Sequence, residues 1–476
     1  MKRFGLGFGA VVVGVVVVGA VLVGVGLQDR RVALSPGPNS FVNADRPGLD
    51  AHNSPAVVAH PDRPEVLVVA DRIDTPRFSC SVSISTNAGL TWRALPLPLP
   101  PGAPNCHGPD VAFDGSGDLL VLFGATGGRF NQPVGVWLQR ITDPAGRGTP
   151  EGEAVPVAGG EAFHSRLVAA GDRVLVTWVQ AQASAAEVPL GFPAPPNPVL
   201  VARSEDGGRT FSAPVQVSED DRLVIQPTVI LGPGGEVVVG ALDLGEDRLD
   251  YQAEHQGQGG APSDEPWRVV TWTSRDGGSR FEPAAVVADG LVAPRRIIVN
   301  LGPSPSFALD PERNRVYASW DAGRGDERDV FLAHSDDGGT TWSRPEPVSP
   351  RPSAQFLPAV GVAPGGRVDV VFYDRSGDPG DVMAEVVVAS SWDGGASFVT
   401  STVSDVAFDS SIGFGSAQGI PLLGSQLAVL SLDDRLHAFW ADTSRGSTAT
   451  NIQDLATAEV EVLPAAGPRW PLVVVG

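Results

Sequence analysis

The chain has 476 residues, including 57 glycines and 43 prolines, and its formal net charge is −21. Glycine and proline at this level, beside 42% hydrophobic residues and without a tripeptide period, predict many short strands joined by turns. The sequence contains no tract of clustered Lys and Arg, which excludes nucleic acid as a partner, because phosphates are neutralised by such clusters.

Residues 1–28 are predicted to be a signal anchor or a signal peptide. After Lys2 and Arg3 no charged residue occurs from Phe4 to Gln28, and a helix of roughly 20 such residues can cross a bilayer. Residues 4–27 are therefore the expected membrane contact. The sequence Gly-Val-Gly at 24–26 is a weak small-x-small cleavage site, so secretion after cleavage is the alternative. In both cases the rest of the chain is exported and lies on the extracellular side.

The chain contains two cysteines, Cys80 and Cys106, which are 26 residues apart. An even number of cysteines in an exported chain predicts a disulfide. A metal pair or a redox centre is disfavoured, because the two cysteines do not have CxxC spacing.

An octet of the form Ser-x-Asp/Asn-x-Gly-x-x-aromatic occurs five times. The copies are STNAGLTW (85–92), SEDGGRTF (204–211), SRDGGSRF (274–281), SDDGGTTW (335–342) and SWDGGASF (391–398). Asp or Asn accepts nearby backbone N–H bonds and Gly supplies a positive φ, so each octet predicts a tight turn between two strands. The structural side chains are then Asn87, Asp206, Asp276, Asp337 and Asp393. The first interval is about twice the others, so a decayed copy is expected at ITDPAGRGTP (141–150).

A second pattern, a short apolar strand, a turn and another apolar strand, occurs seven times. Its copies start at residues 54, 108, 165, 226, 304, 357 and 425. With the two strands that flank an octet, each copy makes a four-stranded antiparallel module, and such modules in series predict an all-β propeller over residues 51–476. Seven blades are expected, with six as the alternative. The last module lacks an octet, so RVALS (31–35), in the linker 29–50, is expected to supply its outer strand and close the ring.

The octets resemble the Asp-box (BNR) repeats of the sialidase-like β-propeller superfamily. The resemblance covers essentially residues 51–476 and implies that the octets are structural and lie on the face opposite the functional one. Sialidases, other glycosidases and non-catalytic binding proteins all carry such repeats, so the function must be argued from the site.

A sialidase in this superfamily uses a tyrosine nucleophile and an aspartate acid/base, roles that the resemblance would give to Tyr373 and Asp74. However, Asn53 stands where the first arginine of the substrate-binding triad is expected. The sequence thus leaves open whether the protein is an enzyme. A sialidase-type glycoside hydrolase that acts on extracellular glycans is the enzymatic alternative.

Two sets of residues are candidate ligand-binding groups. An arginine follows an aspartate at the ends of several second strands, where it could bind a carboxylate or brace its own blade: Arg72, Arg324, Arg375 and Arg445. Polar residues also precede the innermost strands of three blades and are expected around the central channel: His52, Asn53, His107, Asp110, His164 and Arg166. No cofactor is expected, and a divalent metal at these histidines is an alternative.

These features predict an exported propeller that binds an extracellular glycan or a cell-surface protein. A glycoside hydrolase or lyase and an envelope-assembly protein are the other classes considered. The long segments 181–198 and 245–266 both follow second strands and are expected to wall the site.

Overall fold

The structure, a computed structural model, describes residues 32–43, 51–75, 78–127, 132–181, 197–219, 222–247, 265–292, 304–324, 327–413 and 423–464. The predicted anchor, residues 1–28, and most of the two long segments lie outside these ranges. Within the described ranges no helix is long and apolar enough to cross a membrane. Residues 33–463 form one compact unit.

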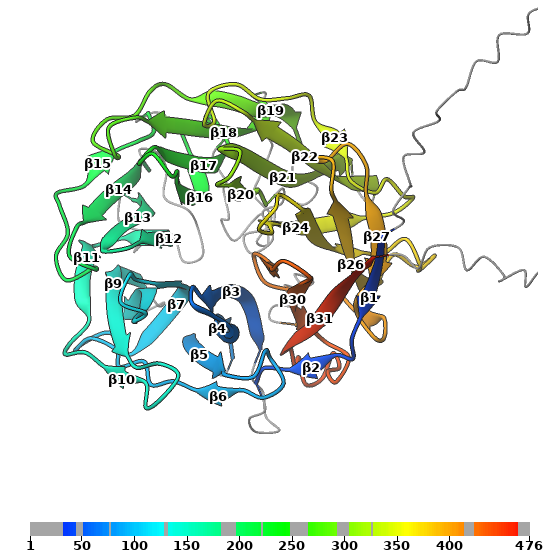
Figure 1. Cartoon of the computed structure of the whole chain (residues 1–476), viewed down its shortest axis with the longest axis horizontal. Coiled ribbons are helices and arrows are strands. Elements are labelled where there is room, and N and C mark those ends of the chain that lie inside the picture. Colours follow the sequence, from blue (N-terminus) through cyan, green and yellow to red (C-terminus); the bar gives the residue numbers. More distant parts are fainter. Residues whose placement is uncertain are drawn as a thin grey trace, which may run out of the picture. The chain divides into compact units, whose positions relative to one another are not determined.

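Seven antiparallel sheets follow one another around a ring in this unit (Figure 1). The first three sheets contain β3 (His52–His60), β4 (Arg63–Ile73), β5 (Ser79–Ser85) and β6 (Arg93–Ala94); β7 (Asn105–Phe113), β8 (Leu119–Gly127), β9 (Gln132–Thr142), β10 (Thr149–Pro150) and β11 (Val155–Gly159); and β12 (Ala162–Ala170), β13 (Arg173–Gln180), β14 (Val199–Ser204) and β15 (Val215–Gln216). We number these sheets, and those that follow, as blades 1 to 7.

Blades 4 to 6 repeat the plan, with the first strand of each blade innermost (Figure 1). They contain β16 (Val224–Leu231), β17 (Val237–Asp243), β18 (Trp267–Ser274) and β19 (Ala285–Leu291); β20 (Ser306–Asp310), β21 (Arg315–Arg324), β22 (Glu327–Ser335) and β23 (Glu346–Pro347); and β24 (Gln355–Val362), β25 (Val368–Asp374), β26 (Met383–Ser391), β27 (Val399–Thr402) and β28 (Phe408–Asp409). The outermost strands of blades 5 and 6 are short, which limits edge pairing with other chains.

Blade 7 joins the two ends of the described chain. It contains β29 (Ala428–Ser431), β30 (Arg435–Asp442), β31 (Asp454–Pro464), β1 (Val32–Pro36) and β2 (Ser40–Phe41), with both N-terminal strands paired to β31. The backbone N–H of Gly37 donates to the carbonyl of Glu459 at 2.8 Å, which continues the pairing beyond β1. The seven-blade prediction and the ring-closing strand at RVALS are both confirmed.

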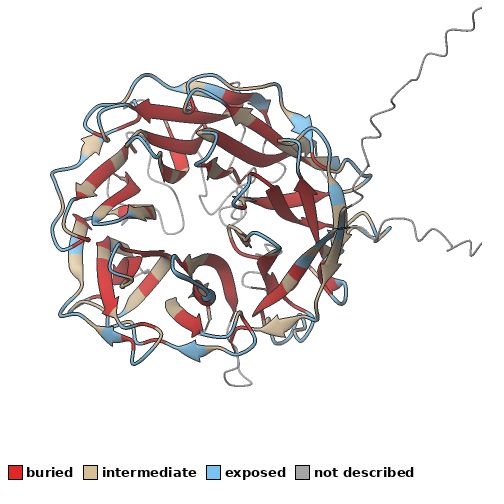
Figure 2. Cartoon of the chain, in the orientation of Figure 1, coloured by how far each residue is buried: buried red, intermediate tan, exposed pale blue. Residues whose placement is uncertain are grey.

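The buried residues lie mostly on the strands of the blades (Figure 2), and hydrophobic side chains from neighbouring blades pack together. Val68 and Val82 of blade 1, for example, share one cluster with Val111 and Val121 of blade 2. Each such side chain stabilises the fold by about 1.5–3 kcal/mol when it is fully buried. The blades therefore depend on their neighbours, which is why the ring must close.

Each octet forms the predicted turn between the third and fourth strands of its blade. In blade 5 the Asp337 carboxylate accepts the backbone N–H of Thr341 at 2.8 Å, and the Ser335 hydroxyl accepts that of Gly339 at 2.8 Å. The same two bonds occur in the other four octets. The decayed copy also forms a turn, in which the carbonyl of Asp143 accepts the N–H of Gly148 at 2.8 Å.

The octets of blades 3 and 5 also bind their blade to the one before it. Arg140 donates to the carbonyl of Gly207, and the Thr271 hydroxyl donates to that of Gly339 at 2.8 Å. Turns alternate between the two ends of an antiparallel sheet, so the octets lie at the end opposite the connections between second and third strands. We call that opposite end the loop face, and it also carries the starts of the innermost strands.

Candidate functional site

The innermost strands of five blades contain a β-bulge near their loop-face ends. At each bulge one residue has a φ between 52° and 55°: Ser54, Gly108, His164, Gln226 and Leu357. Proline follows four of these five, where a ladder N–H is not required. A bulge redirects neighbouring side chains, so the repeat itself provides a place for functional groups around the axis.

Five predicted residues from blades 1 to 3 come together at this end. They are Arg72 at the end of β4, His107 and Asp110 on β7, and His164 and Arg166 on β12. The positive charges of Arg72 and Arg166 both act on His164, and Arg72 also acts on His107. Arg166 in turn acts on Asp110. We call these five residues the axial cluster.

Both histidines of the axial cluster are neutral at neutral pH. Burial, followed by the charge of a nearby arginine, lowers the pKa of His107 to about 4 and that of His164 to about 3. His107 and His164 are half-buried as whole residues, and the Nδ1 of His107 is buried. The His164 Nδ1 accepts the backbone N–H of Gln226 at 3.3 Å, which links blades 3 and 4.

Asp110 connects two blades within the cluster. Its Oδ2 accepts the backbone N–H of Leu167 at 2.9 Å, and its Oδ1 accepts that of Val111 at 3.0 Å. Burial raises the pKa of this carboxyl, although the charge of Arg166 and the two backbone bonds oppose the rise. Asp110 therefore positions β12, the strand that carries His164 and Arg166.

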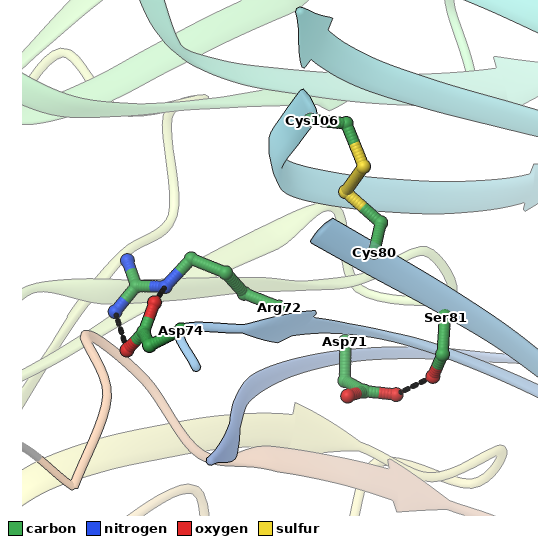
Figure 3. The surroundings of a disulfide bond; sticks show 6 residues. All are labelled: Asp71, Arg72, Asp74, Cys80, Ser81 and Cys106. Atoms are coloured by element: carbon green, nitrogen blue, oxygen red, sulfur yellow. Dashed lines mark hydrogen bonds and ion pairs between the residues drawn. A yellow bond between two sulfur atoms is a disulfide. The ribbon is translucent and has the colours of Figure 1, made fainter. Parts of the chain in front are cut away.

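Arg72 is held in place by Asp74 (Figure 3). The Nε and Nη2 atoms of Arg72 lie 2.8 and 3.1 Å from the two carboxylate oxygens of Asp74. Asn53, which is completely buried, also donates to Asp74 at 2.8 Å. Asp74 is 3% exposed, so in this structure it orients Arg72 and is not accessible for the predicted acid/base role. The buried Asn53 likewise does not face a ligand.

His52 and Asp71 form a second buried pair in blade 1. The Nδ1 of His52 lies 2.6 Å from the Asp71 carboxylate, which also accepts a hydrogen bond from Ser81 (Figure 3). Both His52 and Asp71 are 1% exposed. The prediction that His52 contacts a ligand is therefore wrong for this structure, because its side chain is enclosed in its own blade.

The other predicted arginines do not join the axial cluster. Arg375 donates to the Ser410 hydroxyl at 3.0 Å and lies over the Phe356 ring, and Arg445 pairs with Asp454 at 2.7 Å and lies over the Phe41 ring. These contacts brace blades 6 and 7. The side chain of Arg324 lies outside the described part of the chain. Of the predicted Asp–Arg ends, the structure brings Arg72 alone into the cluster among the described side chains.

Tyr373 is part of the core and cannot act as a nucleophile in this structure. Its side chain is fully buried, and its hydroxyl donates to the carbonyl of Ala441 and accepts the N–H of the same residue, both at 3.1 Å. Burial raises the pKa of this hydroxyl well above its usual range. The sequence placed Tyr373 correctly at the end of a second strand, but its ring turns inward and stacks on Phe356.

The predicted disulfide is present and lies beside the cluster (Figure 3). It joins Cys80 on β5 to Cys106 on β7. Cys80 pairs with Arg72 across β4 and β5, and Cys106 directly precedes His107. The bond therefore joins β7, which carries His107, to β5, the strand that pairs with β4 at Arg72.

Two contributors to the site were missed by the sequence interpretation. Gly124 lies opposite His107 and leaves room for its ring, and Gln426 contacts Arg166. The bulges were also missed, although the X-Pro pairs at the starts of these strands were a visible signal. Among the described residues, no group of three His, Cys, Asp or Glu side chains could hold a metal ion.

The comparisons with known proteins support the fold. No protein-family model and no curated protein sequence matches the chain. Among solved structures, an ulvan lyase from a polysaccharide lyase family matches with a TM-score of 0.50 and 12% identity, over 82% of this chain and 91% of its own. A protein of unknown function from Dyadobacter fermentans (TM-score 0.49, 14% identity, 90% and 99% covered) and a Hadza microbial sialidase (0.44, 14%, 84% and 74%) are also similar. At 12% identity the match to the ulvan lyase shows a shared fold alone.

Proposed function

We propose that the protein is an exported propeller that binds a carboxylate-bearing saccharide at the axial cluster, without tyrosine-nucleophile sialidase chemistry. The observation that carries the proposal is the convergence of Arg72 and Arg166 with two neutral imidazoles from three successive blades. A guanidinium binds a carboxylate through parallel, charge-assisted hydrogen bonds. Neutral imidazoles bind hydroxyl groups without adding charge, and His164, whose Nδ1 accepts the N–H of Gln226, has its Nε2–H as a donor.

The setting of the cluster supports a glycan over a larger anion. The protein carries a formal net charge of −21, which repels extended polyanions, whereas a ligand with isolated carboxylates meets two fixed guanidiniums. Several solved structures with this fold have names that describe action on glycans. We further propose that the octets are Asp-box repeats and that residues 1–28 anchor the propeller on the extracellular side of the membrane.

A hydrolase or lyase that uses the cluster histidines is the second candidate. The observation that favours it is that His107 and His164 are deprotonated at neutral pH and lie in the same cluster as Asp110 and two arginines. A general base works best when its pKa lies near the operating pH, and values of about 4 and 3 lie far below that range. Binding is therefore the stronger candidate.

Titration calorimetry with trigalacturonate and its fully methyl-esterified form tests the proposed function, with 3′-sialyllactose as a second acidic probe. We expect an acidic saccharide to bind, and esterification or the Arg166→Gln substitution to weaken binding at least ~10-fold, the loss of a hydrogen bond to a charged group. Arg209→Gln, on an octet turn, is the matched control and leaves affinity unchanged. Equal binding of acid and ester would contradict the proposal.

A further inference from the structure

The segment 423–427, directly before β29 of blade 7, is fastened onto blade 1. The backbone N–H of Ser425 donates to the Ser54 hydroxyl at 2.9 Å, and the Gln426 Nε2 donates to the carbonyl of Pro55 at 2.8 Å. Ser54 and Pro55 belong to the bulge of β3. Two contacts from adjacent residues fix both the backbone and the amide plane of Gln426.

The other end of the same amide reaches blade 3. The Nη2 of Arg166 donates to the Oε1 of Gln426, while its Nη1 donates to the carbonyl of Ser165 at 3.2 Å. Blades 3 and 7 are not neighbours in the ring, so this hydrogen bond passes through the region around the axis. Gln426 thus holds an edge of the guanidinium that the proposed function assigns to the ligand.

We infer that the Gln426 amide competes with the ligand for Arg166. A ligand carboxylate displaces the amide from Arg166, and a neutral ligand oxygen does not. This inference rests on the proposed function and concerns the specificity of the same site. A carboxylate forms a charge-assisted bond that is roughly twice as strong as the bond to an amide oxygen. A hydroxyl, ester or amide of a ligand gains little by such an exchange, so a neutral saccharide leaves the bond between Arg166 and Gln426 in place.

The bond to Pro55 fixes which end of the Gln426 amide faces Arg166. Because the carbonyl of Pro55 accepts from Nε2, the amide must present Oε1 to Arg166 and cannot turn over without placing two carbonyl oxygens together. Gln426→Glu removes that donor and puts a full carboxylate beside Arg166. In this variant the Glu carboxylate occupies Arg166 in place of the ligand carboxylate. Gln426→Met keeps the length of the side chain and removes both polar atoms.

The experiment measures the affinity for trigalacturonate and for its methyl ester in the wild type and in the Ala, Met and Glu variants of Gln426. We expect the Ala and Met variants to bind the acid up to ~10-fold more tightly, the scale of a net hydrogen bond to a charged group. The ester should gain less than the acid in both variants, because its neutral oxygen forms the weaker bond to Arg166, so the ratio of acid to ester affinity should rise. The Glu variant should lose at least ~10-fold in acid affinity. Gln216→Ala, on the exposed strand β15, is the matched control and changes neither value.

The outcomes separate the inference from the function on which it rests. If the wild type binds the acid but the Ala and Met variants bind equally or more weakly with an unchanged acid-to-ester ratio, Gln426 is a structural residue and the inference is overturned. If neither the wild type nor any variant binds, the proposed function falls and the inference falls with it. Acid binding that becomes measurable in the Ala or Met variant alone supports both.

Discussion

His107 on β7 lies directly opposite Gly124 on β8, and a Cβ at position 124 would come within 2.4 Å of the imidazole Cε1. The absence of a side chain at Gly124 is thus what allows the ring to lie across the neighbouring strand. Gly124→Ala should displace His107 and weaken saccharide binding several-fold, with a cost in the free energy of unfolding of about 1–3 kcal/mol for overpacking. Calorimetry and urea unfolding measure the two effects.

Gly159→Ala is the control for that substitution, because no atom lies within 4 Å of a Cβ built at Gly159. It should change neither affinity nor stability appreciably. If Gly124→Ala binds the acidic probe as the wild type does, the position of His107 does not matter for binding.

The pH dependence of stability follows from the two histidines. Their pKa values in the folded protein, about 4 and about 3, lie below the usual 6.5, so below pH 6.5 the unfolded chain binds protons that the folded chain does not. The two histidines therefore make their full contribution to the free energy of unfolding above pH 6.5. This contribution is lost as the pH falls toward 4, by at most about 1.4 kcal/mol per pH unit for each histidine.

His164→Asn isolates this contribution, since Asn tolerates the φ of 52° at this position. Urea unfolding between pH 6.5 and 4.5 should show a smaller loss of stability in the variant than in the wild type. Identical slopes would mean that His164 is not protected from protonation by its surroundings.

The octet turns should matter for stability and not for binding. Asp337→Ala removes the acceptor for the N–H groups of Thr340 and Thr341, at 3.1 and 2.8 Å, and should cost about 1–3 kcal/mol in unfolding free energy. The octets lie at the end of the blades opposite the axial cluster, so the affinity for the acidic probe should not change. Asp433→Ala, an exposed aspartate in the β29–β30 turn, is the control for stability. A loss of affinity in Asp337→Ala would mean that the site lies at the octet end of the blades and not on the loop face.

Tyr373→Phe tests whether the buried hydroxyl has a chemical role. The variant loses the two hydrogen bonds to Ala441 and should be destabilised by about 0.5–1.5 kcal/mol for each. Saccharide binding, and any turnover of a fluorogenic sialoside, should stay as in the wild type. Turnover in the wild type that disappears in Tyr373→Phe would restore the sialidase interpretation.

The blades could be predicted from the sequence because their signals are local. The Ser335 and Asp337 side chains of an octet bond to backbone groups only a few residues away, so eight letters are enough to specify the turn. The ring-closing strand at 31–35 was also predictable, because the last module visibly lacked an outer strand. The same reasoning placed four of the five cluster residues near the starts of innermost strands, and Arg72 at the end of a second strand.

The orientation and contacts of individual side chains could not be predicted, because they depend on partners distant in the sequence. Tyr373 turns inward to bond with Ala441, 68 residues away, and Arg166 meets Gln426, 260 residues away. Arg72 and Arg375 look alike in the sequence, yet the first joins the axial cluster and the second stacks on a phenylalanine. Closure of the ring decides these pairings, and a single sequence gives no local sign of them.

The most direct test of the central claim follows the imidazole signals of His107, His164 and His437 by NMR during a titration with trigalacturonate at pH 7. His437 is also buried, with a pKa lowered to about 4, but it lies in blade 7 beside Gly89 of blade 1 and outside the axial cluster. We predict that the signals of His107 and His164 shift together with one affinity, while that of His437 stays in place. Saturation of binding with His107 and His164 unmoved would contradict the assignment of the site.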